Sequence, residues 1–145
     1  MKPRKTPKRK DDCIFCRIVA GEVPSFRVCE DERTLSFLDL FPVAPGHALV
    51  VTRDHFSDIF EADAESLAAV AATSLRVARA IDAVLAPEGL GVFQLNRPAA
   101  GQTVFHYHMH LVPRKQGEAF SLHSRVRGDH EELRSLAARL AAAMS

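Results

Sequence analysis

The chain has 145 residues, of which 47% are hydrophobic, and a formal net charge of +1. These values exclude a fibrous or wholly disordered protein and predict one globular domain with a hydrophobic core. No segment has the uninterrupted apolar length of a membrane-spanning helix, and the N-terminus lacks the apolar stretch of a signal peptide. We therefore expect a soluble cytoplasmic protein without a membrane partner.

The small net charge hides an uneven distribution of charged residues. Residues 1–10 carry six basic side chains and no acidic one, whereas the remainder carries 13 basic and 18 acidic side chains. Two prolines and closely spaced like charges predict a disordered basic tail over residues 1–12, followed by a single domain over 13–145. A solvated tail is the simplest interpretation, and weak contact with nucleic acid or anionic lipid is the alternative.

The first predicted elements are a short helix and a β-hairpin. The helix covers residues 14–20 and ends where glycine and proline follow the apolar run. Strands are predicted over 26–29 and 34–40, separated by an acidic turn. Asp39 interrupts the apolar alternation near the end of the second strand. It is therefore either a site residue held by the sheet or a strand end that bends into solvent.

A third strand and a long helix follow the hairpin. Residues 41–46 contain two prolines and a glycine and predict a rigid loop before a strand over 47–52. From Asp63 to Leu85, apolar residues recur at helical spacing. This spacing, with Asp63 as the N-cap, predicts a long amphipathic helix.

Two more strands and a final helix complete the expected fold. Strands over 91–96 and 104–113 flank a polar loop and predict a second hairpin, and residues 115–128 read as irregular loop. Asp129 and Glu132 have the spacing of a capping box that opens a C-terminal helix. Because the strands come in hairpins, the expected class is α+β: an antiparallel sheet of about five strands with one long helix and two shorter ones.

Three histidines alternate with other residues in the last predicted strand. Since successive side chains of a strand point to opposite faces, His106, His108 and His110 should share one face. The residues between them can then pack beneath the helices, and the imidazoles are left to line a surface or a cleft. Histidine titrates near neutral pH, so such a row can supply a nucleophile, an acid or metal ligands.

Two mechanisms fit this row of histidines. In the first, one imidazole attacks phosphorus and forms a covalent phosphohistidine, while its neighbours orient it and protonate the leaving group. In the second, two or three imidazoles bind zinc, and a metal-bound water performs the hydrolysis.

A pair of cysteines bears on the choice between these mechanisms. Cys13 and Cys16 are separated by two residues, a spacing that recurs among zinc ligands. Two histidines would complete a closed Cys₂His₂ site, and His47, His55 and His106 are the candidates. A redox pair, or two buried cysteines without a ligand, are the alternative interpretations.

Taken together, these segments resemble the histidine triad (HIT) family of nucleotide hydrolases and transferases. The sequence HYHMHLV at residues 106–112 has the family's alternation of histidine and hydrophobic residues. Other similar segments occur in the family's order, namely CIFCRIVAGEVP (13–24), LSFLDL (35–40), APGHALV (44–50), LN (95–96) and GQTVFHYHMH (101–110). The resemblance covers residues 13–114 and implies the HIT-like version of the α+β fold.

The resemblance implies a hydrolase that acts at the α-phosphorus of nucleoside monophosphate derivatives, such as phosphoramidates, adenylylated compounds or dinucleoside polyphosphates. His108 would be the nucleophile that forms a nucleotidyl-histidine intermediate, and His110 would position or protonate the leaving group. Gln102 and Thr103 would donate hydrogen bonds to the phosphate. His47 would lie close to the triad as a supporting imidazole.

The resemblance also implies a pocket for a purine nucleotide or a nucleotide derivative. Asp39 would accept hydrogen bonds from the ribose hydroxyls, and Asn96 would lie near the phosphate. The base would rest among apolar side chains, namely Phe15, Ile18, Val23, Phe37, Leu38 and Leu40.

Family members that carry both cysteines are similar in binding structural zinc. This implies Cys13, Cys16, His106 and His55 as ligands in this chain, with His47 as the competing fourth ligand. The resemblance further implies a homodimer whose sheet continues across a two-fold axis. Two alternative functions stay open: a metal-dependent hydrolase that uses zinc-bound water, and a non-catalytic nucleotide-binding module that uses the basic tail.

Overall fold

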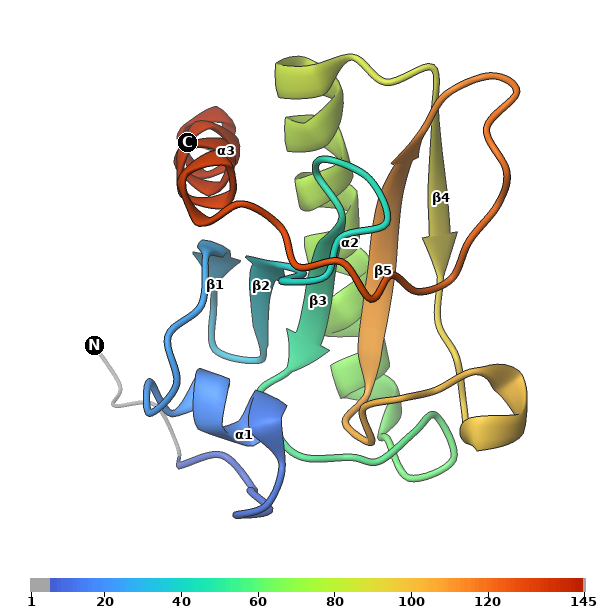
Figure 1. Ribbon diagram of the computed structural model, residues 1–145. Coiled ribbons are helices and arrows are strands. Elements are labelled where there is room, and N and C mark those ends of the chain that lie inside the picture. Colours follow the sequence, from blue (N-terminus) through green and yellow to red (C-terminus); the bar gives the residue numbers. More distant parts are fainter. Residues whose placement is uncertain (1–5, 145) are drawn as a thin grey trace.

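The computed structural model describes residues 6–144 and has, within them, one five-stranded sheet and three α-helices (Figure 1). The strands are β1 (Arg27–Glu30), β2 (Thr34–Leu38), β3 (Ala48–Thr52), β4 (Gly89–Phe93) and β5 (His108–Arg114). The helices are α1 (Ile14–Val19), α2 (Ala64–Leu85) and α3 (His130–Ala143), and a 3₁₀ turn covers Pro98–Ala100. The predicted α+β class is confirmed.

The strands lie in the order β1-β2-β3-β5-β4, and each neighbouring pair is antiparallel. Both predicted hairpins are present, β1 with β2 and β4 with β5. Because α2 connects β3 to the edge strand β4, the returning strand β5 lies between them. The histidine-bearing strand is therefore flanked by a strand on each side.

Two hydrophobic clusters lie on opposite faces of the sheet. One face packs against α2 and α3 and buries Val50 and Leu111 beside Ile81 of α2. In Figure 1, α2 runs behind the sheet along β3 and β5. The other face packs against α1, where Phe15 contacts Phe37 with ring centres 5.4 Å apart. The face covered by α1 is only partly filled, which leaves room for a site.

Side-chain caps determine where the two long helices begin. The Asp63 carboxylate accepts a hydrogen bond from the backbone N–H of Ser66 at 2.7 Å, so the predicted N-cap of α2 is confirmed. Asp129 does the same for α3 with the N–H of Glu132 at 3.0 Å. Each carboxylate satisfies a free N–H and interacts favourably with the helix dipole.

The last strand begins later than predicted, at His108 instead of residue 104. The preceding backbone bonds to the segment after β3, because the N–H of Tyr107 donates to the carbonyl of Phe56 at 2.7 Å. His106 therefore lies outside the strand, which corrects the prediction that all three histidines belong to it.

Two other predicted strands, 34–40 and 91–96, end earlier, at Leu38 and Phe93. Asp39 lies just beyond β2, where its carboxylate accepts the N–H of Phe41 at 2.9 Å and begins a turn. The strand therefore ends before Asp39, but the side chain is only 22% exposed and does not bend freely into solvent.

Residues 6–12 lie against the domain. The N–H of Lys8 donates to the Asp54 carboxylate at 2.8 Å, and the carbonyl of Lys8 accepts from the N–H of His55 at 2.8 Å. Arg9 forms an ion pair with Glu22 at 2.9 Å. Residues 1–5 of the predicted tail lie outside the described residues. Within residues 6–144, no helix combines the length and the apolar character that crossing a membrane requires.

Truncating a core side chain of α2 should destabilise the fold. Ile81 is 0% exposed, so Ile81→Ala leaves a cavity and should lower the free energy of unfolding by about 2–5 kcal/mol. Leu75 is 51% exposed on the same helix, and Leu75→Ala should change that free energy by less than about 0.5 kcal/mol. Urea unfolding measures both values, and equal losses would contradict this orientation of α2.

Candidate active site and metal cluster

The strand register places a row of side chains across the face of the sheet that α1 covers. Phe37 lies opposite Leu49, Leu49 opposite His110, and His110 opposite Phe93. Residues opposite each other in antiparallel strands point to the same face. His108 is two residues before His110 in β5 and shares that face. Two of the three histidines therefore lie on one face of β5, away from α2 and α3.

A cavity of about 490 Å³ opens on this face. Its walls come from α1, the end of β2, the loop before β5 and the segment 115–128. Eight of the residues predicted from the sequence line it: Phe15, Ile18, Phe37, Asp39, Leu40, Thr103, His108 and His110. The cavity thus combines an apolar wall with a group of imidazoles and one carboxylate.

Other residues predicted for the site do not line this cavity, namely Val23, Leu38, His47, Asn96 and Gln102. Leu38 follows Phe37 in β2 and so points to the opposite face, where it is buried with the side chains of α2 and α3. Val23 packs at the margin of the cluster beneath α1. Leu38 therefore belongs to the core on the far side of the sheet and Val23 to the packing beneath α1, and neither lines the cavity.

The segment 115–128, predicted only as irregular loop, supplies His123, Ser124 and Arg125 to the cavity. No periodic spacing relates these residues to β5, so the only signal in the sequence was a further histidine in a polar loop. Other lining residues absent from the predictions are Ile14, Phe41, Leu49 and Val104. Phe93 was also missed, and its ring stacks on His110 at 4.6 Å between centres.

The hydrogen bonds of His108 define its tautomer. Nδ1 lies 2.6 Å from the carbonyl oxygen of His106, which can only accept, so Nδ1 carries the proton and Nε2 the lone pair. Phe15 contacts the ring on one side at 5.0 Å and His110 contacts it at 4.8 Å, measured between ring centres. Burial lowers the pKa of His108 and favours this neutral form.

His47 and His110 form a second ordered pair. The N–H of Val43 donates to Nδ1 of His47 at 3.1 Å, so neutral His47 carries its proton on Nε2. That nitrogen lies 3.0 Å from Nδ1 of His110 and donates to it, which leaves the proton of neutral His110 on its own Nε2. Burial lowers the pKa of His47 to about 4 and that of His110 to about 2, so both are neutral at pH 7.

A carboxylate lies beside this pair. Oδ2 of Asp39 is 3.6 Å from Nε2 of His47, and both residues contribute ligand atoms to a cluster with His110. Burial raises the pKa of Asp39, while the hydrogen bond from the N–H of Phe41 favours the ionised form.

A separate cluster could hold a metal ion. The ligand atoms of Cys13, Cys16, His55 and His106 all lie within 4.8 Å of one another. Nδ1 of His106 is 3.3 Å from the Cys13 sulfur, and Nδ1 of His55 is 3.3 Å from the Cys16 sulfur. Tetrahedral zinc bound to sulfur and nitrogen requires separations of about 3.5 Å between ligand atoms. The geometry therefore fits zinc, and His47 lies in the other cluster.

The surroundings also suit a cation. Nε2 of His106 donates to the carbonyl of Thr52 at 2.6 Å, which leaves the lone pair of Nδ1 directed at the sulfurs. Cys13 is the N-cap of α1, and the N–H of Cys16 donates to its sulfur at 3.4 Å. Burial raises the pKa of the Cys16 thiol to about 11, a cost that a bound cation would offset by stabilising the thiolate.

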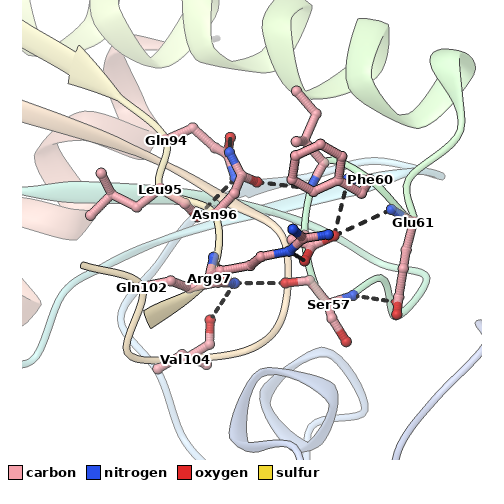
Figure 2. A network of polar contacts seen from close by, with 11 residues as sticks. Ser57, Phe60, Glu61, Gln94, Leu95, Asn96, Arg97, Gln102 and Val104 are labelled. Atoms are coloured by element: carbon pink, nitrogen blue, oxygen red, sulfur yellow. Dashed lines mark hydrogen bonds and ion pairs between the residues drawn. The ribbon is translucent and has the colours of Figure 1, made fainter. Parts of the chain in front are cut away.

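Gln102 is buried in a polar network between the loop before β5 and the segment after β3 (Figure 2). Its side-chain oxygen accepts the N–H of Arg97 at 2.6 Å. Its side-chain nitrogen donates to the carbonyls of Ser57 at 2.6 Å and Val104 at 3.1 Å. Because both amide protons are used within the protein, Gln102 positions this loop instead of lining the cavity.

Asn96 belongs to the same network, which explains why it too is absent from the cavity. Its side-chain oxygen accepts the N–H of Ile59 at 2.8 Å. The guanidinium of Arg97 lies 4.2 Å from the centre of the Phe60 ring (Figure 2). These contacts connect residues 94–104 to residues 57–61 and so set the position of Thr103 in the cavity wall.

Comparisons with known proteins point to one family. A family model described as the HIT domain matches residues 20–117. The Bacillus subtilis protein called Protein hit is 38% identical over 135 residues, which cover 90% of this chain and 93% of that protein. The crystal structure of a zinc-bound histidine triad family protein from Mycobacterium smegmatis has a TM-score of 0.81 at 37% identity, covering 92% of this chain and 93% of that one. Adenylylsulfatase HINT3 of Arabidopsis thaliana is 33% identical over 107 residues, which cover 74% of this chain and 54% of that protein.

Gln102→Glu should destabilise the loop before β5. A carboxylate cannot donate to the carbonyls of Ser57 and Val104 and would be buried beside both oxygens. The free energy of unfolding should therefore fall by about 1–3 kcal/mol. Gln116 is exposed, so Gln116→Glu should change it by less than about 0.5 kcal/mol. Denaturant unfolding compares the two variants, and unchanged stability of Gln102→Glu would contradict the network.

Proposed function

The chain belongs to the HIT family, and we propose that it is a nucleotide hydrolase acting at the α-phosphorus of a nucleoside monophosphate derivative. The leaving group would be an amine, the acid part of an adenylylated compound, or a polyphosphate. The observation that carries the proposal is the hydrogen bond of 2.6 Å between Nδ1 of His108 and the carbonyl oxygen of His106. It leaves the lone pair of a neutral imidazole on Nε2, in a residue that lines the cavity.

The proposed reaction has two steps. In the first, the lone pair of His108 Nε2 attacks the α-phosphorus, a P–N bond forms, and the bond to the leaving group breaks with its electron pair. In the second, water attacks the same phosphorus, the P–N bond breaks, and His108 regains its lone pair. The products are a nucleoside monophosphate and the free leaving group, which together take up the two hydrogens and the oxygen of one water.

His110 is proposed to donate to the departing atom or to a phosphate oxygen. Its proton is on Nε2 because Nδ1 accepts from His47, whose own tautomer depends on the N–H of Val43. Burial, together with the neighbouring imidazoles, lowers the pKa of His110 to about 2. A bound phosphate would oppose that effect, because a nearby negative charge favours the protonated ring. His47 is therefore proposed as a positioning residue for His110.

The nucleoside is proposed to occupy the rest of the cavity. The apolar side chains of Phe15, Ile18 and Phe37 suit a base, and the carboxylate of Asp39 suits the hydroxyl groups of a ribose. Thr103, exposed at the wall, is proposed to donate to the phosphate. Gln102 would act on the phosphate only through the loop that it holds.

We further propose that Cys13, Cys16, His55 and His106 bind a zinc ion. A bound zinc ion would supply structural cross-linking, because four protein ligands leave no position for a water molecule. Its support is the ligand geometry together with the zinc-bound relative from Mycobacterium smegmatis.

Hydrolysis by a metal-bound water at the other cluster is the second candidate, since Asp39, His47 and His110 have ligand atoms within 4.8 Å of one another. The tautomers argue against it. The N–H of Val43 donates to Nδ1 of His47, so Nε2 carries a proton and has no lone pair for a metal. To bind a metal, His47 would have to move its proton to Nδ1 and lose the hydrogen bond from Val43. The covalent mechanism requires no such change.

The remaining interpretations stay predictions. A homodimer would extend the sheet from an edge strand, and Val92 of the edge strand β4 is 51% exposed. A binding module that uses the basic tail would bind nucleotide or nucleic acid tightly without turnover, and salt would weaken that binding. Deleting residues 1–10 and repeating the binding assay tests this alternative.

Replacing His108 should abolish turnover and the covalent intermediate. We expect His108→Ala to lower kcat by a factor on the order of 10³ or more, since it removes the lone pair that is proposed to form the P–N bond. A substrate labelled at the α-phosphate should label the wild-type protein in an acid quench but not His108→Ala. His123→Ala, which removes another imidazole lining the cavity, should still be labelled. Turnover by His108→Ala at close to the wild-type rate would rule out this mechanism.

The metal proposal predicts about one zinc ion per chain in the purified protein. Cys16→Ser should lose the metal and unfold at a lower temperature, whereas Cys29→Ser, in β1 outside the cluster, should retain it. Metal analysis and thermal unfolding measure both effects. Chelation should weaken the fold, and protein that stays folded should keep its turnover. Loss of turnover with an intact fold would favour the metal-bound water instead.

A further inference from the structure

A segment between β5 and α3 passes in front of β5 and β3 (Figure 1). Hydrogen bonds anchor it on both sides of the cavity. At one anchor, Nε2 of His123 donates to the carbonyl of Gly101 at 2.6 Å, in the loop before β5. At the other, the N–H of Gly128 donates to the carbonyl of Leu40 at 2.8 Å, just past the end of β2. We call residues 123–128 the strap.

The strap brings an unpaired cation to the cavity. Arg125 lies between the two anchors and lines the cavity together with His108 and His110. Apart from histidines, the charged side chains of the described walls are Asp39 and Arg125. Arg125 is exposed, and within residues 6–144 its guanidinium has no hydrogen bond or ion pair to a carboxylate. A cation without a protein partner is available to an anionic ligand.

In the proposed complex, the other walls of the cavity contact the nucleoside and the reacting phosphorus. The phosphorus must lie within reach of His108, which is 7% exposed and lies deep in the cavity. Asp39 and the apolar wall of α1 and β2 suit the ribose and the base. The groups that extend from the phosphorus away from the nucleoside are left to meet the strap. A guanidinium binds phosphate oxygens through charge-assisted hydrogen bonds.

We propose that Arg125 is a specificity-determining residue that binds an anionic leaving group and so favours nucleoside polyphosphates over derivatives with an amine leaving group. The inference rests on the function proposed above. When the bond at the α-phosphorus breaks, a polyphosphate leaves with the electron pair as negative charge on its oxygen, which Arg125 stabilises. An amine must instead gain a proton, and a guanidinium gives it no comparable support.

Equilibrium binding of adenosine monophosphate and adenosine diphosphate tests the role of Arg125 without requiring turnover. The diphosphate has a second phosphate that can reach the strap, so the wild type should bind it more tightly. Arg125→Ala should reduce the ratio of the two affinities by about tenfold, the effect of one lost hydrogen bond to a charged group. Arg125→Lys should restore part of the ratio. Because Arg125 is exposed, salt should screen its attraction for the second phosphate. Higher salt should therefore bring the affinity ratio of the wild type toward that of Arg125→Ala.

Arg127 provides a matched control. It is in the same strap but lines a different cavity, beside His130 and Arg134 of α3. Arg127→Ala should therefore leave the affinity ratio unchanged. If Arg125→Ala weakens both ligands equally, Arg125 contacts the α-phosphate and the inference is wrong. An unchanged ratio in Arg125→Ala would also overturn it.

Kinetics separate this inference from the proposed function. With adenosine phosphoramidate and a diadenosine polyphosphate as substrates, Arg125→Ala should lower kcat/KM about tenfold more for the polyphosphate. Equal losses for the two substrates contradict a role at the leaving group. If the wild type turns over neither substrate, the proposed hydrolase function fails, and the binding ratio still decides whether Arg125 recognises a second phosphate.

Discussion

The hydrogen bond between Nδ1 of His108 and the carbonyl oxygen of His106, 2.6 Å long, determines which nitrogen of His108 is unprotonated. A carbonyl oxygen can only accept, so the neutral ring keeps its lone pair on Nε2. Burial lowers the pKa of His108, and the neutral form is therefore the stable one near neutral pH. Backbone geometry and desolvation thus leave an unprotonated nitrogen on His108, as the proposed nucleophile requires.

His106 connects the metal cluster to the candidate active site. Its Nδ1 lies 3.3 Å from the sulfur of Cys13, its Nε2 donates to the carbonyl of Thr52, and its own carbonyl holds His108. The side chain of one residue therefore belongs to the metal cluster, and its backbone contacts the candidate active site. Anything that holds the ring of His106 in place also restrains the carbonyl that orients His108. A zinc ion bound there, as proposed, would thus be connected physically to the proposed reaction without a role in its chemistry.

Two irregular segments complete the cavity, and each is held by contacts between parts of the chain that are distant in sequence. The loop before β5 is held by the amide of Gln102, which bonds to the carbonyl of Ser57, and by Asn96, which accepts the N–H of Ile59. The strap is held by the bond from His123 to Gly101 and by a backbone bond at its other end. Neither segment contains a strand or an α-helix that would position it, so these hydrogen bonds between distant parts of the chain do so instead.

The sequence by itself determined the fold class, the long helix and the pairing of histidines on one face, because periods of 2 and 3.6 residues are local properties of the chain. It also identified the cysteine pair as candidate metal ligands from its spacing. Only the tertiary structure decided that His55 and not His47 lies with the cysteines, and that Gln102 is turned away from the cavity. Only the fold, likewise, brought Arg125 to the cavity wall. The hydrogen-bond partner of a side chain can lie far away in sequence, and such a pairing leaves no periodic pattern in the chain. The role of the side chain therefore depends on which distant segments the fold brings together.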